Sequence, residues 1–191
     1  MCCLYVLASM SFLKIHVCLC NVITFNPIAL QDCGFINEVR NECAAEFLHI
    51  SAKYTIEETL NWFDNTKPTF YVILYNSVKI GYFRITNYSH VNKNLYIGAD
   101  LHQDFRGKGL AYEAYRKFIP TIIKQYDLHK VSLEVLATNT RAHNLYTKLR
   151  FVNEGVKRQE VYKNGQYVDS IIMSILKSEV EANDIYCTKS L

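Results

Sequence analysis

Apolar and polar residues alternate in several short segments from residue 22 onward, and this pattern predicts β-strands. Three of these segments, residues 69–76, 79–88 and 94–102, are rich in aromatic and β-branched side chains and are separated only by short polar breaks. Such spacing is typical of consecutive antiparallel strands. Residues 22–28 and 130–137 have the same strand-like character, so the sequence predicts a sheet assembled from distant parts of the chain.

The last two predicted strands form a hairpin. Residues 151–162 and 167–176 flank a four-residue connection at 163–166. Its central pair, Asn164 and Gly165, readily adopts the two positive φ angles that a type I′ turn requires. The chain from residue 151 is therefore expected to add two adjacent antiparallel strands to the sheet.

Between the strand segments, apolar residues recur at intervals of three and four, which predicts amphipathic helices. Residues 32–48 form the first, with Asp32 as its N-cap, and Thr55 caps a second. A longer helix contains Pro120, which must remove a hydrogen bond or bend the helix. A short helix capped by Thr138 precedes the final hairpin.

The predicted order of elements is β α α β β β α β α β β, with a glycine-containing loop after a central strand. This order is typical of the α+β or mixed α/β class, in which helices cover a sheet. A length of 191 residues fits one domain with a substantial core. We expect that domain at residues 21–177, with an apolar extension at 1–20 and a frayed polar tail at 178–191.

The apolar extension resembles neither a secretory signal nor a membrane span. A signal peptide has basic residues before its apolar region, whereas the first charge here is Lys14, after that region. Lys14 and His16 also interrupt the run of about 20 apolar residues that a spanning helix needs. We therefore expect no membrane association. The extension is either an additional packed element or a segment upstream of a functional start at Met10.

Charge and cysteine content narrow the partners and the compartment. The chain has 21 Lys and Arg against 18 Asp and Glu, and a net charge of +3 is too small to predict a nucleic-acid-binding surface. The cysteines crowd near the N-terminus, and no Cys/His group has zinc spacing. We expect a reduced, intracellular and cytoplasmic protein in which Cys33 and Cys43 pack.

The loop at residues 104–109 places two glycines and two cations directly before a predicted helix. The first N–H groups of a helix have no intrahelical acceptor and carry partial positive charge. Gly107 and Gly109 allow a ligand to approach the backbone closely, and Arg106 and Lys108 add charge. The loop therefore predicts a phosphate or pyrophosphate site. It lacks the P-loop and dinucleotide-fold patterns, which disfavours ATP and NAD.

Two motifs of this chain resemble those of the Gcn5-related N-acetyltransferases, the GNAT family. Arg106, Gly109 and Ala111 match the family's acetyl-CoA loop, R/Q-x-x-G-x-G/A. Residues 135–151, VLATNTRAHNLYTKLRF, are similar to the later family pattern V-x-x-x-N-x-x-A-x-x-L-Y-x-K-x-G-F. The residues that match in register are Asn139, Ala142, Leu145, Tyr146, Lys148 and Phe151. Arg150 replaces the family's glycine, and a positive φ there would cost about 1 kcal/mol.

The resemblance covers about residues 22–176 and is greatest to one branch of the family. That branch often has an Arg-Asn pair in the region of its first helix, as Arg40 and Asn41 stand here. That branch includes ribosomal-protein N-terminal, spermidine and nucleotide-amino-sugar acetyltransferases. The resemblance implies a twisted, mostly antiparallel sheet of about seven strands with about four helices, splayed at the acetyl-CoA site. It implies acetyl-CoA as co-substrate and no metal, and it allows a homodimer.

The resemblance also implies a role for each motif residue. The pyrophosphate site would consist of Arg106, Gly107, Lys108, Gly109, Leu110 and Ala111. The strand end at Leu101 would lie along the pantetheine, where a backbone N–H polarises the thioester carbonyl. Asn139 would contact the CoA arm, and Tyr146 would be the general acid that protonates the departing thiolate. For Tyr146 the alternative is an ordinary buried aromatic.

The general base and the acceptor contacts are open to more than one interpretation. Asp100 and His102 alternate onto one face at the end of the central strand, where either could take the amine proton directly or through water. For each, the alternative is a turn or capping residue. Arg84, with Tyr82 on the same face, needs an anionic partner, which would be a substrate phosphate or an internal carboxylate.

His49 and Trp62 lie in the region that shapes acceptor pockets in this family, with simple packing as the alternative for both. We expect direct attack of a primary amine on acetyl-CoA. A nucleotide-linked amino sugar is the first hypothesis and needs a closed, cationic pocket around Arg84. A protein N-terminus or a polyamine is the second, and a peptide needs an open groove. A non-catalytic acyl-CoA-binding module is the alternative of another class, against which Tyr146 argues.

Overall fold

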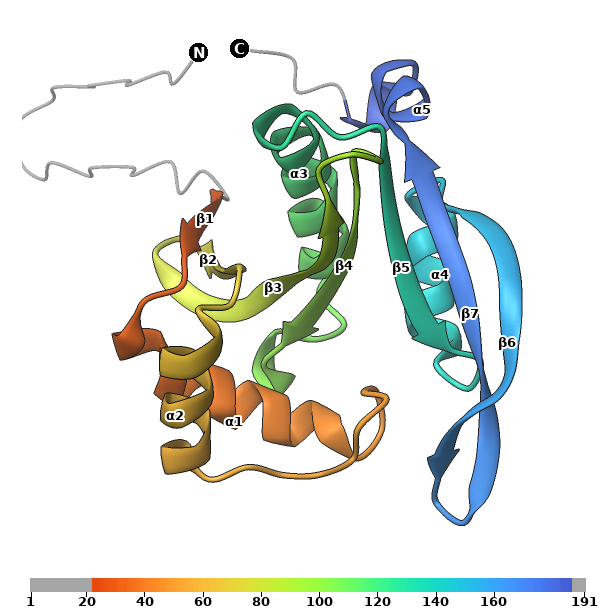
Figure 1. Ribbon diagram of the computed structural model, residues 1–191. Helices are drawn as coiled ribbons and strands as arrows, with labels where there is room; N and C mark the ends of the chain where they lie inside the picture. The colour runs from red at the N-terminus through yellow and green to blue at the C-terminus, as the bar shows by residue number, and fades with distance from the viewer. Residues whose placement is uncertain (1–21, 187–191) are drawn as a thin grey trace, which may run out of the picture.

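The computed structural model describes residues 22–186, which form one seven-stranded sheet with helices on both faces (Figure 1). The strands are β1 Ile23–Pro27, β2 Phe70–Tyr75, β3 Val78–Ser89, β4 Asn94–Leu101, β5 Lys130–Leu136, β6 Val152–Lys163 and β7 Gln166–Leu176. Their order in the sheet is β1-β2-β3-β4-β5-β7-β6. All neighbours are antiparallel except β4 and β5, which are parallel.

The helices divide between the two faces of the sheet (Figure 1). They are α1 Cys33–Ala44, α2 Ile56–Thr66, α3 Leu110–Gln125, α4 Thr140–Lys148 and α5 Lys177–Glu181, with short 3-10 turns at Leu30–Asp32, Gln103–Phe105 and Asp184–Tyr186. α3 and α4 cover one face, and α1 and α2 cover the other. The predicted order of elements is confirmed, and none of the helices within residues 22–186 is long and apolar enough to cross a membrane.

Alternating side chains of β3 build two separate cores. Phe83 stacks on Phe118 of α3, with ring centroids 4.2 Å apart, in the larger core. Its neighbour Tyr82 points to the other face, where it stacks on Phe70 and packs beside Val39 of α1. Because each strand residue faces the side opposite to the next and both faces are covered here, the consecutive residues 80–83 of β3 are all buried.

The two central residues of the predicted turn, and Arg150, which replaces the family's glycine, all have positive φ angles. Asn164 and Gly165 have φ angles of 51° and 83°, which confirms the type I′ hairpin. Arg150 has a φ of 66°, so it occupies the left-handed conformation that the family's glycine would adopt without strain. α3 continues through Pro120 from Leu110 to Gln125.

The helix caps differ in part from those predicted. Thr55 caps α2 as expected, because its hydroxyl accepts the N–H of Glu58. Asp32 stands at the N-cap position of α1, but its carboxylate accepts the N–H of Ala29 at 2.8 Å and makes no side-chain cap. The predicted capping role is therefore wrong, since this carboxylate instead closes the preceding turn and pairs with Lys79 at 2.6 Å.

The cap of α4 also differs from the prediction. Asn139, not Thr138, is the N-cap, and its side-chain oxygen accepts the N–H of Ala142 at 3.1 Å. The tail differs as well, because residues 177–186 form α5 and a 3-10 turn that bury Val180 and Tyr186. Tyr186 donates a hydrogen bond to the Leu149 carbonyl at 2.6 Å. A frayed tail is therefore wrong as far as residue 186, while residues 1–21 and 187–191 lie outside the described part.

Candidate active site

The two parallel strands β4 and β5 separate in the middle of the sheet (Figure 1). They pair only where residues 94–96 face residues 130–132, although β4 continues to Leu101 and β5 to Leu136. Beyond that pairing, backbone groups on the facing edges have no strand partner. The N–H of His102 bonds to the carbonyl of Ile80 on β3, so the N–H of the preceding residue, Leu101, points the other way, into the opening.

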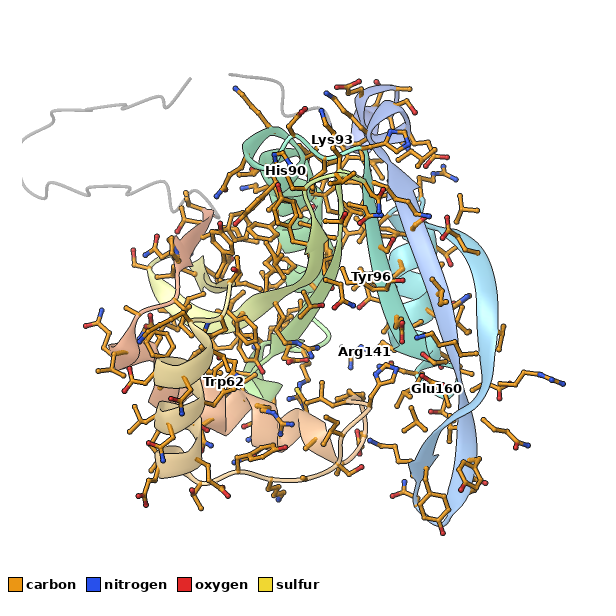
Figure 2. All side chains as sticks on the ribbon, viewed as in Figure 1. Trp62, His90, Lys93, Tyr96, Arg141 and Glu160 are labelled. Carbon is orange, nitrogen blue, oxygen red and sulfur yellow. The ribbon has the colours of Figure 1, made fainter. Side chains whose placement is uncertain are left out.

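A cleft of about 1210 Å³ passes through this opening. It is lined by residues of the α3 face, such as Tyr115 and Tyr146, and by residues of the α1 face, such as Arg84 and Asp100. Figure 2 shows Arg141 at the opening between β4 and β5. A volume above the usual range of about 300–1,000 Å³ for a small-molecule site is suited to two substrates that meet from opposite faces.

The loop before α3 forms one wall of the cleft. Gly107 and Gly109 have φ angles of 80° and 77°, which side chains rarely adopt. Gly109 is the N-cap of α3 and carries no side chain, so no side-chain cap satisfies the first N–H groups of the helix. A Cβ atom at Gly109 would meet open space, whereas one at Gly107 would approach Arg141 to 3.2 Å. The predicted phosphate cradle is thus present as bare backbone at a helix N-terminus.

Cations surround this cradle. The lining includes Lys108, Lys117, Arg141 and Lys148. Arg106 is also in the lining, but its guanidinium is held by neighbours: its Nε donates to the Leu101 carbonyl at 2.8 Å, and its terminal nitrogen pairs with Glu42 at 3.2 Å. The structure therefore places Arg106 where it ties the loop to the end of β4.

Tyr146 lines the cleft, with its hydroxyl 3.3 Å from that of Tyr115. Its side chain is 8% exposed, and burial raises its pKa above the usual value near 10. The phenol is therefore protonated near pH 7 and can donate a proton. Asn139 lines the same wall and, because its oxygen caps α4, only its NH₂ group is free to face a ligand.

On the α1 face, Arg84 and Asp100 form an ion pair. Nε of Arg84 lies 3.3 Å from Oδ2 of Asp100, whose carboxylate is only 4% exposed, and Gly98 leaves room for the guanidinium because a Cβ there would lie 2.9 Å from it. The partner that the sequence left open for Arg84 is thus an internal carboxylate. Arg84 itself remains 35% exposed toward the cleft.

A second pair of opposite charges faces the first across the cleft. Glu134 of β5 binds Lys157 of β6 at 2.5 Å through one oxygen, and its other oxygen lies 3.8 Å from Nε2 of His49. The same nitrogen lies 2.9 Å from the hydroxyl of Ser170 on β7. None of these residues belongs to a sequence motif. Among them, only His49 lies in the region that the family resemblance associates with the acceptor pocket.

Three predicted site residues lie outside the lining of the cleft. His102 is turned toward α1, with Nε2 3.3 Å from Glu42, and its Nδ1 accepts the N–H of Asp104. Trp62 packs on a core ring at 5.2 Å, and Figure 2 shows it on α2, away from the opening. Tyr82 is buried beside Asp100, and burial holds its pKa well above the usual value. None of these three side chains contributes to the lining of the cleft, and each contacts neighbouring protein groups instead.

Cys43 is a free cysteine whose thiol lines the cleft. Burial, and then the nearby Asp100 carboxylate, raise its pKa to about 12. Because the thiolate is the nucleophilic form, this cysteine is inert near neutral pH. Both Cys33 and Cys43 pack in the interior, as the sequence predicted.

Comparisons with known proteins agree with this geometry. The "Acetyltransferase (GNAT) domain" family model matches residues 23–152. The putative ribosomal N-acetyltransferase YdaF of Bacillus subtilis is 29% identical over 109 residues, which are 57% of this chain and 60% of that protein. The spermidine N(1)-acetyltransferase of Escherichia coli is 23% identical over 168 residues, 82% of this chain and 87% of that protein.

A solved spermidine N-acetyltransferase from Vibrio cholerae, in complex with CoA and spermine, superposes with a TM-score of 0.77 at 21% sequence identity. The superposition covers 82% of this chain and 96% of that one, which confirms the expected sheet and its helices. The family model spans more than half of the chain, and the two motifs that carried the resemblance line the same cleft. The chain belongs to the GNAT family of acetyltransferases.

Proposed function

We propose that this chain transfers the acetyl group of acetyl-CoA to a primary amine by direct attack. The glycine cradle before α3, the open end of β4 and the cations of the lining fit a pyrophosphate followed by an extended arm. Acetyl-CoA supplies an activated thioester. Cys43, with its pKa near 12, is unsuited to a covalent intermediate, which supports a single displacement.

Different residues of the cleft perform the separate steps of the reaction. The N–H of Leu101 points into the opening and polarises the thioester carbonyl, so that charge on the tetrahedral intermediate is stabilised by a fixed donor. Tyr146 donates its proton to the sulfur as the C–S bond breaks. Lys108 and the backbone of Gly107, Gly109, Leu110 and Ala111 hold the pyrophosphate, while the guanidinium of Arg106 keeps this loop attached to the end of β4. The Asn139 NH₂ group contacts the CoA arm.

For the acceptor, we propose the α-amine of a peptide or protein N-terminus. The observation that carries this choice is the charge balance of the acceptor side, where Arg84 is paired with Asp100 and Glu134 with Lys157. A nucleotide-linked amino sugar needs an unpaired cation for its phosphates, and a polyamine needs unpaired carboxylates. An α-amine has one charge and a pKa of about 7.7–8.0, so it loses its proton more easily than an alkylamine near 10.4.

A polyamine is the second candidate, because the Escherichia coli and Vibrio cholerae relatives are spermidine acetyltransferases. A panel assay separates the two. The purified chain is incubated with acetyl-CoA and, separately, with short peptides of free N-terminus, with spermidine and with a nucleotide-linked amino sugar, while free CoA thiol is measured. We expect the highest kcat/KM with a peptide. A preference for spermidine would mean that the acceptor is a polyamine and not a peptide. Failure to bind acetyl-CoA would overturn the whole proposal.

Tyr146→Phe tests the chemistry in the same assay. The variant keeps the ring that packs against Tyr115 and Phe151 and removes only the hydroxyl. We expect kcat to fall by about 10²-fold or more, within the usual range for general acids, with the acetyl-CoA affinity unchanged. Tyr115→Phe removes the other hydroxyl of the pair and is the matched control. Equal losses in both variants would indicate that the pair is structural.

A further inference from the structure

His49 occupies a position in the cleft that no motif explains. It lies in the connection between α1 and α2 and, among the described residues that line the cleft, it is the only histidine. Its side chain is 35% exposed, so a substrate can reach it. It is fixed from the far side by Ser170 on β7 at 2.9 Å, and Arg84 and Asp100 line the same cleft on β3 and β4.

Charged groups face His49 from three neighbouring elements. Glu134 of β5 is the nearest, at 3.8 Å, while Lys157 and Glu160 belong to β6 and Arg84 to β3. Burial is the largest influence and lowers the pKa of His49 below its usual value of 6.5. Glu134 and Glu160 act in the opposite direction, and the two cations add to the lowering. The imidazole is therefore neutral at pH 7, and Glu134 stands beside it to stabilise an imidazolium once that forms.

The other candidates for the base are less suitable. Asp100 is almost fully buried and already paired with Arg84 at 3.3 Å, so its carboxylate is engaged by a neighbour and is not available to an incoming amine. His102 lies outside the lining and faces Glu42. His49 is exposed within the cleft that Tyr146 also lines from the α3 face, so the imidazole is available to an acceptor amine there.

We propose that His49 is the general base of the transfer, an assignment that rests on the proposed function. The ammonium of the acceptor gives one proton to the imidazole and becomes a neutral amine. Its lone pair forms the C–N bond at the thioester carbon, and the C–S bond breaks as Tyr146 protonates the sulfur. The nitrogen then loses a second proton, which restores the phenol through solvent. Amide and free CoA result, and His49 releases one proton to solvent.

The test compares the pH dependence of kcat at saturating peptide and acetyl-CoA. In the wild type, kcat rises as the pH increases through the pKa of His49, because only the neutral imidazole accepts a proton. His49→Gln retains a side chain that can bond to Ser170 but cannot take the proton. We expect kcat at pH 7 to fall by about 10²-fold and this acidic limb to disappear, with acetyl-CoA affinity unchanged. Imidazole added to His49→Ala should restore part of the rate.

His90→Gln is the matched control, because His90 is an exposed turn residue that Figure 2 shows far from the opening. Glu134→Gln is a second, independent variant. Since Glu134 raises the pKa of His49, its removal should move the acidic limb to lower pH, a result that does not require His49→Gln to fold. An acidic limb that persists in His49→Gln, or that stays in place in Glu134→Gln, would overturn the assignment. A wild type that acetylates no amine would instead refute the proposed function.

Discussion

The two sides of the cleft are built in different ways. The donor side is made mainly of backbone, with two positive-φ glycines and the N-terminus of α3 in one continuous segment. The acceptor side is made of side chains from five separate places: Arg84 on β3, Asp100 on β4, Glu134 on β5, Lys157 on β6 and His49 after α1. One side is a local conformation, and the other exists only after the sheet has formed.

This difference affects what each side can recognise. Backbone N–H groups at a helix N-terminus bind a phosphate whatever the neighbouring side chains are, so the donor side depends on few residue identities. Paired side chains neutralise one another, and exchanging one member changes the charge that an acceptor meets. We therefore expect substitutions on the donor side to abolish binding of acetyl-CoA and substitutions on the acceptor side to change stability and acceptor choice instead.

Gly109→Trp should have the largest effect and act on the donor side alone. The Cβ position at Gly109 meets open space, so the new ring enters the cradle rather than the core. Because the ring would occupy the pyrophosphate position, we expect acetyl-CoA affinity to fall by more than about 100-fold, or roughly 3 kcal/mol, as measured by calorimetry. The acceptor-side ion pairs should remain intact.

Gly165→Trp is the control for this substitution. Gly165 also has a positive φ, 83°, and open space at its Cβ position, but it lies in the β6–β7 turn. Backbone strain should therefore destabilise both variants similarly, by about 1 kcal/mol, and only Gly109→Trp should lose acetyl-CoA. Equal acetyl-CoA affinities in the two variants would mean that the cradle does not hold the donor.

Arg84→Met tests the acceptor side. It leaves the Asp100 carboxylate buried without its partner, and breaking a buried pair costs about 3–5 kcal/mol. Because Arg84 is about one-third exposed, we expect a smaller loss of about 2–3 kcal/mol in the free energy of unfolding, measured in urea. Acetyl-CoA affinity should change little, in contrast to Gly109→Trp.

The double variant Arg84→Met/Asp100→Leu separates the ion pair from simple packing. If the loss comes from an unpaired buried charge, removing that charge as well should recover most of the stability. If the double variant is less stable than Arg84→Met, packing of the arginine is the dominant contribution. In either case the comparison shows how strongly the acceptor side is coupled to the fold.

The difference between the donor side and the acceptor side also explains which features could be predicted from the sequence. Strands and helices follow from local periodicity, and the residue 104–114 segment carries its own conformation in its glycines. The predicted caps at Asp32 and Thr138 are wrong for different reasons. The Asp32 carboxylate accepts the N–H of Ala29 instead of one from α1, and Asn139 rather than Thr138 accepts the N–H of Ala142. Local patterns are therefore enough to predict the glycine loop. Tyr146 and Leu101 are assigned from the family resemblance, and both lie in the lining of the cleft.

The acceptor side could not be assembled in the same way. The sequence showed that Arg84 needs an anionic partner. That partner, Asp100, lies on the next strand, and only the register between β3 and β4 brings the two together. His102 alternates with Asp100 along the sequence, yet β4 ends at Leu101 and the chain turns, so the imidazole faces Glu42. Glu134 and Lys157 meet across β7, which lies between β5 and β6 in the sheet. Long-range pairing of this kind has no local signature.

Arg150→Gly should have the smallest effect. It restores the glycine of the family motif, and we expect it to change the stability of the fold but not the binding of acetyl-CoA. Arg150 is exposed and has a φ of 66° at the end of α4, where a glycine avoids the strain. We expect a gain of about 1 kcal/mol, or about 2–4 °C in Tm, with acetyl-CoA affinity unchanged. Asn164→Gly, at φ 51°, is the matched control and should gain less, because asparagine tolerates this conformation. A change in affinity in Arg150→Gly would instead couple the end of α4 to the cradle.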